Sequence, residues 1–218
     1  MNLLDIEFGN IETRIKNAIN FLKKGKGILI LDDEKRENES DIVFAAENIS
    51  IENIAFSIRY GSGIICLCIT EYLRKKLKLP MMVKKNTNFY KTGFTVSIEA
   101  AKGISTGVSA KDRFTTIKTA ISDNVIPTDL NKPGHVFPLR AVDGGLFKRQ
   151  GHTEATIDLL KIAKMQLVGV LCELTNKNGT MANKFDTISF AKKNKMIVIT
   201  INDIKQYFMK NNFSSKNL

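Results

Sequence analysis

Short apolar runs alternate along the chain with segments in which apolar residues recur at helical spacing. The apolar runs predict buried strands, because a strand covered on both faces has no regularly polar position. These runs lie at 27–31, 42–46, 64–69, 168–172 and 196–200, and an alternating run at 94–98 predicts a strand with one wetter face. Spacings of three and four residues predict helices at 11–22, 51–58, 110–121, 153–163 and 185–194, and a last helix from 203.

Buried strands separated by amphipathic helices are typical of an α/β fold (α+β type) in three layers, with helices on both faces of one twisted sheet. The runs that flank Asp32 to Asp41 follow each other too closely for a helical crossover, so we expect a mixed sheet. No linker, repeat or low-complexity segment interrupts the sequence. We therefore expect a single domain over 1–208, followed by a frayed tail at 209–218.

Composition narrows the class of protein. The chain has 218 residues, 43% of them hydrophobic and 25% charged, which is typical of a globular protein. It contains no apolar run of about 18 residues and no secretory signal at its start, so we expect no membrane association. Its three cysteines fit a reduced cytoplasmic setting better than a disulfide framework.

The net charge of +11 raises the possibility of a nucleic-acid partner. Only seven of the 33 basic residues are Arg, and the lysines are scattered in ones and twos. Aromatic residues are not interleaved with them, as single-strand binding usually requires. A small phosphorylated anion is therefore the better partner for this charge.

The segment from Asp32 to Asp41 is unusual because it holds six carboxylates in ten residues of an otherwise basic chain. A solvated loop is the simplest interpretation. The segment nevertheless follows a buried strand, where open α/β sheets bind ligands. Clustered carboxylates repel one another unless a cation joins them, so a hard divalent metal is the alternative.

The two histidines of the sequence each follow a glycine. His135 lies in a segment rich in turn-forming residues, and His152 directly precedes a predicted helix. A lone histidine is commonly structural, but placement in loops favours a functional site. Arg149 beside a helix N-terminus is typical of a phosphate-binding site, although Thr153 could simply cap that helix.

Three weaker signals remain. The small-residue loop 103–109 suits phosphate or sugar hydroxyls, but such loops are common. Cys66 and Cys68 share one face of a strand, where core packing is more typical than zinc binding. Glu173 ends a hydrophobic strand, a position that suits an acid–base group as well as a cap or an ion pair.

Seven segments in order carry a resemblance to a known family: LDDEKRENESDIVFAAE, RYGSGIICLCIT, TGFTVSIEA, GISTGVSAKDR, DLNKPGHVFPLRA, RQGHTEATIDL and GVLCELTNKNGTMA. Over about 8–207 the chain resembles the stand-alone form of 3,4-dihydroxy-2-butanone 4-phosphate synthase of riboflavin biosynthesis. The resemblance implies a cytosolic homodimer with active sites near the subunit interface. It also implies conversion of ribulose 5-phosphate to formate and L-3,4-dihydroxy-2-butanone 4-phosphate, with Mg²⁺ or Mn²⁺, two ions per subunit, and no organic cofactor.

The resemblance assigns roles to individual residues. It places Glu37 and His152 at the metal, and Arg36 and Asp41 at the substrate. The residues implied to hold the phosphate end are Arg149, Gln150, Gly151, His152 and Thr153. His135 and Glu173 are implied to be essential for catalysis, with Glu173 also contacting substrate. Residues implied to line the same pocket are Asp32, Glu39, Cys66 and Thr106.

Two departures from the family pattern concern loop geometry. Ser40 and Gln150 stand where the family commonly has glycine, so Ser40 would be strained at a positive φ and Gln150 would crowd the phosphate site. Three alternatives also remain at this point. They are a metal-dependent phosphosugar isomerase or aldolase, a basic nucleic-acid-binding protein, and an inactive relative of the synthase.

Overall fold

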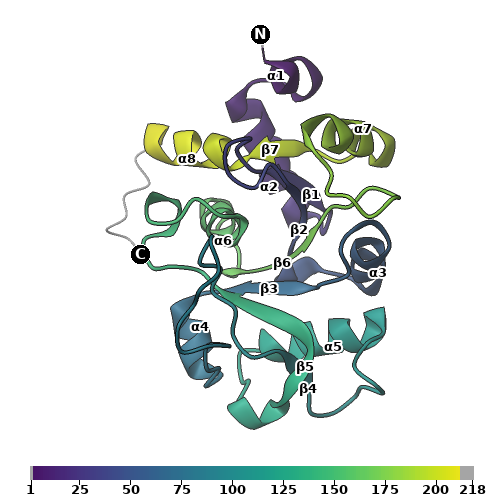
Figure 1. Ribbon diagram of the computed structural model, residues 1–218, viewed down its shortest axis with the longest axis vertical. Helices are drawn as coiled ribbons and strands as arrows, with labels where there is room; N and C mark the ends of the chain where they lie inside the picture. Colours follow the sequence, from purple (N-terminus) through teal and green to yellow (C-terminus); the bar gives the residue numbers. More distant parts are fainter. Residues whose placement is uncertain (1, 212–218) are drawn as a thin grey trace.

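A seven-stranded mixed sheet forms the centre of the computed structural model, which describes residues 2–211 (Figure 1). Its strand order is β4-β5-β3-β6-β2-β1-β7. The strands are β1 (Ile28–Leu31), β2 (Ser40–Ala45), β3 (Cys66–Ile69), β4 (Ile98–Ala100), β5 (Leu130–Arg140), β6 (Val168–Glu173) and β7 (Val198–Thr200). The helices are α1 (Leu3–Phe8), α2 (Ile11–Lys23), α3 (Ile51–Tyr60), α4 (Glu71–Lys76), α5 (Ala110–Ala120), α6 (His152–Ala163), α7 (Lys184–Asn194) and α8 (Ile201–Lys210). Short 3-10 turns are η1 (Ala46–Asn48), η2 (Pro127–Asp129) and η3 (Gly145–Phe147).

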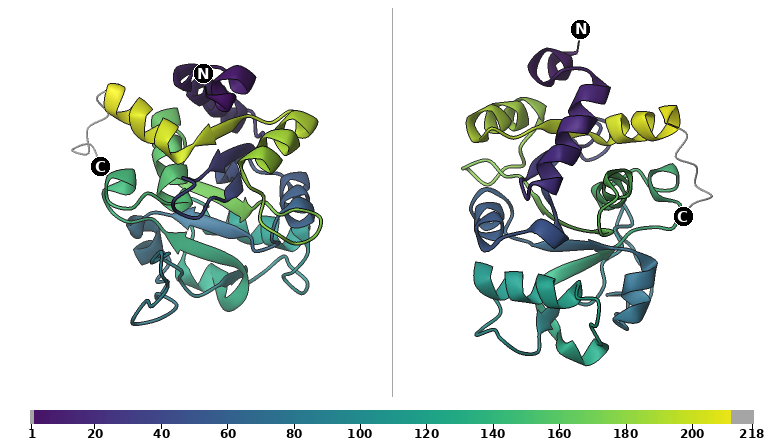
Figure 2. Two further views of the ribbon diagram at one scale, coloured as in Figure 1. Left: turned by 45° about the horizontal axis from the view of Figure 1, so that its top comes forward. Right: turned by 180° about the vertical axis from the view of Figure 1, so that it is seen from behind.

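Helices cover both faces of this sheet. Side chains of β1 alternate between the faces, so that Leu29 packs into one apolar cluster and Ile30 into the other. The first cluster includes residues of α3, α5 and α7, and the second includes residues of α2, α6 and α8. In the view from behind, the green α6 and yellow α8 lie across the sheet from the blue α3 and teal α5 (Figure 2). The three-layered fold expected from the sequence is therefore confirmed.

The strand pairing brings the acidic segment that follows β1 close to Glu173 at the end of β6. β1 and β2 form an antiparallel hairpin in which Leu31 lies opposite Ser40, and β2 pairs antiparallel with β6, placing Asp41 opposite Glu173. The mixed sheet is completed by parallel pairing of β1 with β7 and of β3 with β5. The acidic segment thus includes the hairpin loop between β1 and β2, and this loop lies at the end of the sheet where β6 also ends.

Local capping explains several helix boundaries. Ser50 and Asn53 form a capping box at α3, and Thr200 and Asp203 form one at α8. No helix within the described residues is both long and apolar enough to cross a bilayer.

Four sequence expectations need correction. His135 lies in the long strand β5 instead of a loop, and Thr153 lies inside the first turn of α6, whose N-cap is Gly151. The strand expected at 94–98 is β4, three residues long and shifted toward the C-terminus. Met209 and Lys210, expected in the tail, continue α8, and 212–218 lie outside the described residues. The short helices α1 and α4 were not anticipated.

Candidate active site

The acidic loop is organised around Asp32. Its Oδ2 accepts hydrogen bonds from Arg36 Nη1 at 2.5 Å and from the Glu37 amide at 3.1 Å. Asp32 also donates its own amide to the Glu39 carbonyl at 3.0 Å, which closes the loop. The left-handed position is Asn38, with φ of 52°, whereas Ser40 is buried in β2. The strain anticipated at Ser40 is therefore absent, because asparagine takes up the positive φ.

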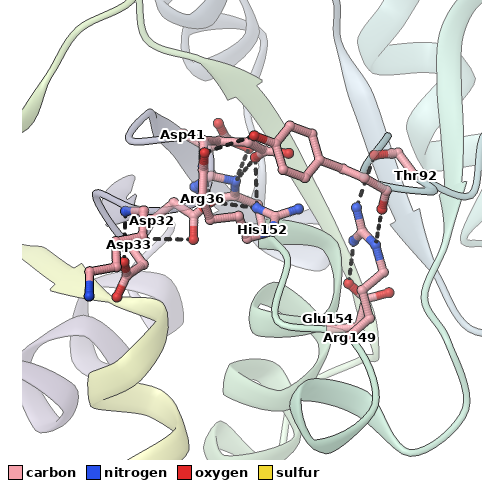
Figure 3. Close-up of polar contacts among 11 residues, drawn as sticks. Asp32, Asp33, Arg36, Asp41, Thr92, Arg149, His152 and Glu154 are labelled. Atoms are coloured by element: carbon pink, nitrogen blue, oxygen red, sulfur yellow. Dashed lines mark hydrogen bonds and ion pairs between the residues drawn. The ribbon is translucent and has the colours of Figure 1, made fainter. Parts of the chain in front are cut away.

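Asp32, Glu37 and His152 form a cluster in which one potential metal-ligand atom from each lies within 4.8 Å of the others. His152 Nδ1 lies 3.4 Å from Glu37 Oε2 and 3.7 Å from Asp41 Oδ2 (Figure 3). Only 7% of His152 is exposed, and its Nε2 is buried without a hydrogen-bond partner. This cluster joins the hairpin loop to the first residue of α6.

Burial and the charges of neighbouring side chains shift the pKa values of Glu37, Asp41 and His152. Burial raises the pKa of Asp41 to about 7. Burial disfavours the charged His152 ring, but the carboxylates of Asp41 and Glu37 outweigh it and raise the pKa of His152 to about 9. Burial opposes ionisation of Glu37 as well, yet His152 and Arg36 lower its pKa. A concentration of negative charge thus surrounds one imidazole.

These residues fit a divalent cation. Carboxylate oxygens suit hard ions such as Mg²⁺ and Mn²⁺, and imidazole is a common additional ligand. A buried ring nitrogen without a partner is costly, and metal coordination would remove that cost. The cluster therefore offers carboxylate and imidazole ligands for a divalent cation, and its imidazole has one buried nitrogen, Nε2, without a hydrogen-bond partner.

The N-terminus of α6 lies beside the cluster and has no side-chain cap. A Cβ at Gly151 would lie 2.1 Å from Arg149 Nη1, so any larger residue there would displace this guanidinium from its present position. Arg149 is held by Glu154 Oε2 at 2.6 Å, by the Tyr90 carbonyl at 3.0 Å and by Thr92 Oγ1 at 2.9 Å (Figure 3). A fixed guanidinium next to free helix amides suits a phosphate group.

Glu173 closes the site from β6. Its Oε2 accepts a 2.5 Å hydrogen bond from the hydroxyl of Ser62, and its carbonyl accepts from the Ser62 amide at 2.8 Å. Burial, with the nearby charges of Glu37 and Glu173, raises the pKa of Glu39. Burial also raises the pKa of the Cys66 thiol well above its ordinary value, so Cys66 is neutral at physiological pH.

His135 lies apart from this group. It is on β5, and β3 lies between β5 and β6, so the two strands are about 10 Å apart. Its Nδ1 contacts the carboxylate of Glu99 on β4. Thr106 belongs to an exposed loop whose neighbouring Gly107 lies against the Glu99 carboxylate. The candidate residues therefore form two groups: most gather around His152, while His135 and Thr106 lie with Glu99.

Five residues of the site escaped the sequence interpretation: Ser62, Tyr90, Thr92, Glu99 and Glu154. Four lack a local signal, because their partners are distant along the chain. Glu154 could have been suspected, since a carboxylate in the first turn of the helix that follows Arg149 is close enough along the chain to pair with this arginine. Its carboxylate accepts from Arg149 and from the Val142 amide at 2.9 Å.

A cluster of potential metal ligands beside a helix N-terminus and a fixed arginine, where strands of an α/β sheet end, is typical of an enzyme that acts on a small phosphorylated substrate. The family model of 3,4-dihydroxy-2-butanone 4-phosphate synthase matches residues 16–207. The chain belongs to this family and is a lyase of riboflavin biosynthesis, as its sequence led us to expect.

Individual relatives of the chain carry the same family name. The chain is 64% identical over 201 residues to the 3,4-dihydroxy-2-butanone 4-phosphate synthase of Buchnera aphidicola subsp. Acyrthosiphon pisum, covering 92% of this chain and 94% of that protein. It is 57% identical to the enzyme of Pectobacterium carotovorum, with 92% and 93% covered. A crystal structure of a 3,4-dihydroxy-2-butanone 4-phosphate synthase in complex with two magnesium ions matches with a TM-score of 0.87 and 35% identity, over 91% of this chain and 97% of that one.

Proposed function

We propose that this chain converts D-ribulose 5-phosphate to L-3,4-dihydroxy-2-butanone 4-phosphate and formate at the cluster around His152. The reaction needs no external oxidant, because oxidation of the excised carbon to formate is balanced by reduction of the first carbon, which loses its hydroxyl. The stages are enolisation, loss of the first hydroxyl as water, a skeletal shift, and release of the fourth carbon as formate with uptake of one water, so that the two products together have the composition of the substrate. Each stage moves protons at one bound substrate, which requires several acid–base groups together.

Glu37 and His152 would hold the divalent metal, Mg²⁺ or Mn²⁺, with Asp32 as a further ligand. Such a metal would act as a Lewis acid that stabilises negative charge on substrate oxygens. The relative solved with two magnesium ions supports two ions per subunit here as well. The observation that carries this assignment is the buried imidazole of His152, whose Nδ1 lies 3.4 Å from Glu37 Oε2 and 3.7 Å from Asp41 Oδ2 in a cluster that also includes Asp32.

The substrate would extend from this cluster toward α6. Arg36 and Asp41 would bind its hydroxyl end, and Arg149 with the α6 N-terminus (Gly151, His152, Thr153) would bind the phosphate. Gln150 is exposed next to this position. Glu173 would transfer protons, supported by Ser62, with Glu39 and Cys66 lining the pocket.

His135 is the remaining group implied to be essential, yet it lies on β5, and both β3 and β6 stand between β5 and the strand β2 that carries Asp41. We propose a homodimer whose sites lie near the interface, so that His135 and Thr106 of one subunit serve the cluster of the other. The buried, unpaired thiols of Cys66, Cys68 and Cys172 are compatible with a reducing compartment, and we place the enzyme in the cytoplasm.

The test is formate detection after mixing the purified protein, ribulose 5-phosphate and Mg²⁺, with EDTA as the control. We expect formate that disappears with EDTA. A phosphosugar isomerase or aldolase would consume the same substrate without formate, and that result would contradict the proposal.

A further inference from the structure

Residues 83–92 form an irregular segment that reaches the active site through Tyr90, which contacts Arg36 and Arg149. The segment is closed at its base by the hydrogen bond from the Met82 amide to the Phe94 carbonyl at 2.9 Å. Within it only Asn86, Tyr90 and Thr92 are not exposed. The adjacent Phe89 is 86% exposed, so the segment turns one aromatic ring to solvent and the next one toward the protein.

The ring of Tyr90 lies against Arg36. The guanidinium carbon of Arg36 is 4.7 Å from the ring centroid, within the range of a cation–π interaction. The phenol hydroxyl of Tyr90 also donates to the Arg36 carbonyl at 2.8 Å. Tyr90 therefore contacts both the side chain and the backbone of one proposed substrate-binding arginine.

The backbone of the same segment holds the second arginine. The carbonyl of Tyr90 accepts from Arg149 Nε at 3.0 Å, and Thr92 Oγ1 accepts from Arg149 Nη2 at 2.9 Å (Figure 3). A guanidinium has five N–H donors, so these contacts and the one to Glu154 fix its plane and leave donors for an anion.

Asparagines shape the turn that presents Tyr90. Asn88 Oδ1 accepts from the Tyr90 amide at 2.9 Å, and the Asn86 amide group donates to the Thr92 carbonyl at 2.9 Å. Lys91 occupies the left-handed region at φ of 54°. These local bonds define the backbone of the turn, while the Tyr90 ring anchors it to the acidic loop.

We infer that Tyr90 is a positioning residue that sets Arg36 and Arg149 for substrate binding; this inference rests on the proposed function. Arginine side chains lose rotamer entropy when they are fixed. Ordering both before substrate arrives removes that cost from binding. One residue thus links the arginine at the hydroxyl end of the substrate to the arginine at its phosphate end.

The experiment compares formate production by the wild type, Tyr90→Phe and Tyr90→Leu at saturating Mg²⁺. Tyr72→Leu is the matched control, because Tyr72 is 77% exposed on α4. Losing both the ring and the hydroxyl should raise the KM for ribulose 5-phosphate, and the inhibition constant of inorganic phosphate, about tenfold. Tyr90→Phe keeps the ring over Arg36 and should restore most of the affinity, with a KM about threefold above the wild type.

A positioning role further requires that kcat falls less than KM rises and that Mn²⁺ affinity is unchanged in both variants. A KM for Tyr90→Leu within twofold of the wild type would overturn the inference, as would a loss of kcat or metal affinity at constant KM. Wild-type protein that produces no formate would instead refute the proposed function, and the inference with it.

Discussion

The hydroxyl of Ser62 lies 2.5 Å from Glu173 Oε2, so the loop before β3 supports the carboxylate that ends β6. Hydrogen bonds to charged groups contribute about 1.5–3 kcal/mol, which corresponds to roughly tenfold to hundredfold in rate if the bond persists in the transition state. Ser62→Ala should therefore lower kcat by that factor. Ser62 is exposed, so Ser62→Thr has room for its methyl group and should restore kcat. Unchanged formate production by Ser62→Ala would show that Ser62 does not act on Glu173.

Glu37→Ala should abolish turnover even at saturating Mg²⁺, because it removes a proposed metal ligand. The matched control is Glu34→Ala in the same loop, whose side chain is 69% exposed. Titration with Mn²⁺ followed by electron paramagnetic resonance should show weakened binding for Glu37→Ala alone. Normal activity of this variant at saturating metal would sink the assignment.

Subunit mixing tests where His135 acts. Glu37→Ala and His135→Ala should each be inactive, but hybrid dimers would contain one site with an intact cluster and an intact histidine. Random exchange makes half of the dimers hybrid, so about a quarter of wild-type activity should return. If His135 serves its own subunit, every site in the mixture carries one defect, and no activity returns.

The free energy of unfolding should depend on pH through Asp112, which accepts hydrogen bonds from the loop that carries Thr106. Hydrogen bonds from the Ser105 hydroxyl and amide and from the Gly107 amide lower the pKa of Asp112. A lowered pKa means that Asp112 contributes stability above the unfolded-state pKa, and that this contribution is lost as pH falls through the folded-state value. Asp112→Asn should therefore destabilise the protein most at neutral pH. Urea unfolding from pH 7 to pH 3 should show the difference from wild type shrinking, and a constant difference would contradict this account.

Arg14 should be a major contributor to stability. It is 1% exposed and donates to Asp203 at 2.9 and 3.0 Å, to Asp5 at 2.5 Å and to the Gly9 carbonyl at 2.5 Å. Arg14→Met leaves Asp203 buried without its cation and should cost about 3–5 kcal/mol of unfolding free energy. Lys16→Met on the same helix removes only an exposed pair with Glu12 and should change little. If urea unfolding shows the same loss of unfolding free energy for both variants, the buried ion pairs of Arg14 do not have this stabilising role.

Much of the fold was predictable because its signals are local. The apolar run at 27–31 and the helical spacing of Ile11 to Leu22 reflect burial patterns that each element carries in its own sequence. The family resemblance added the candidate residues, and the structure brings Asp32, Arg36, Glu37, Asp41 and His152 together. Strand β5 was missed because its Pro133 and Gly134 resemble turn residues, whereas pairing with β3 and β4 keeps it extended.

The layers, the acidic hairpin loop and the types of group available for catalysis follow from local sequence, because period and composition are properties of neighbouring residues. Which of those groups meet depends on the three-dimensional packing. Tyr90 contacts Arg36 and Arg149, and Ser62 contacts Glu173, through loops whose path depends on the packing of the whole sheet. Strand order likewise separates His135 from His152, since a strand's neighbours are set by long-range pairing that no local pattern encodes.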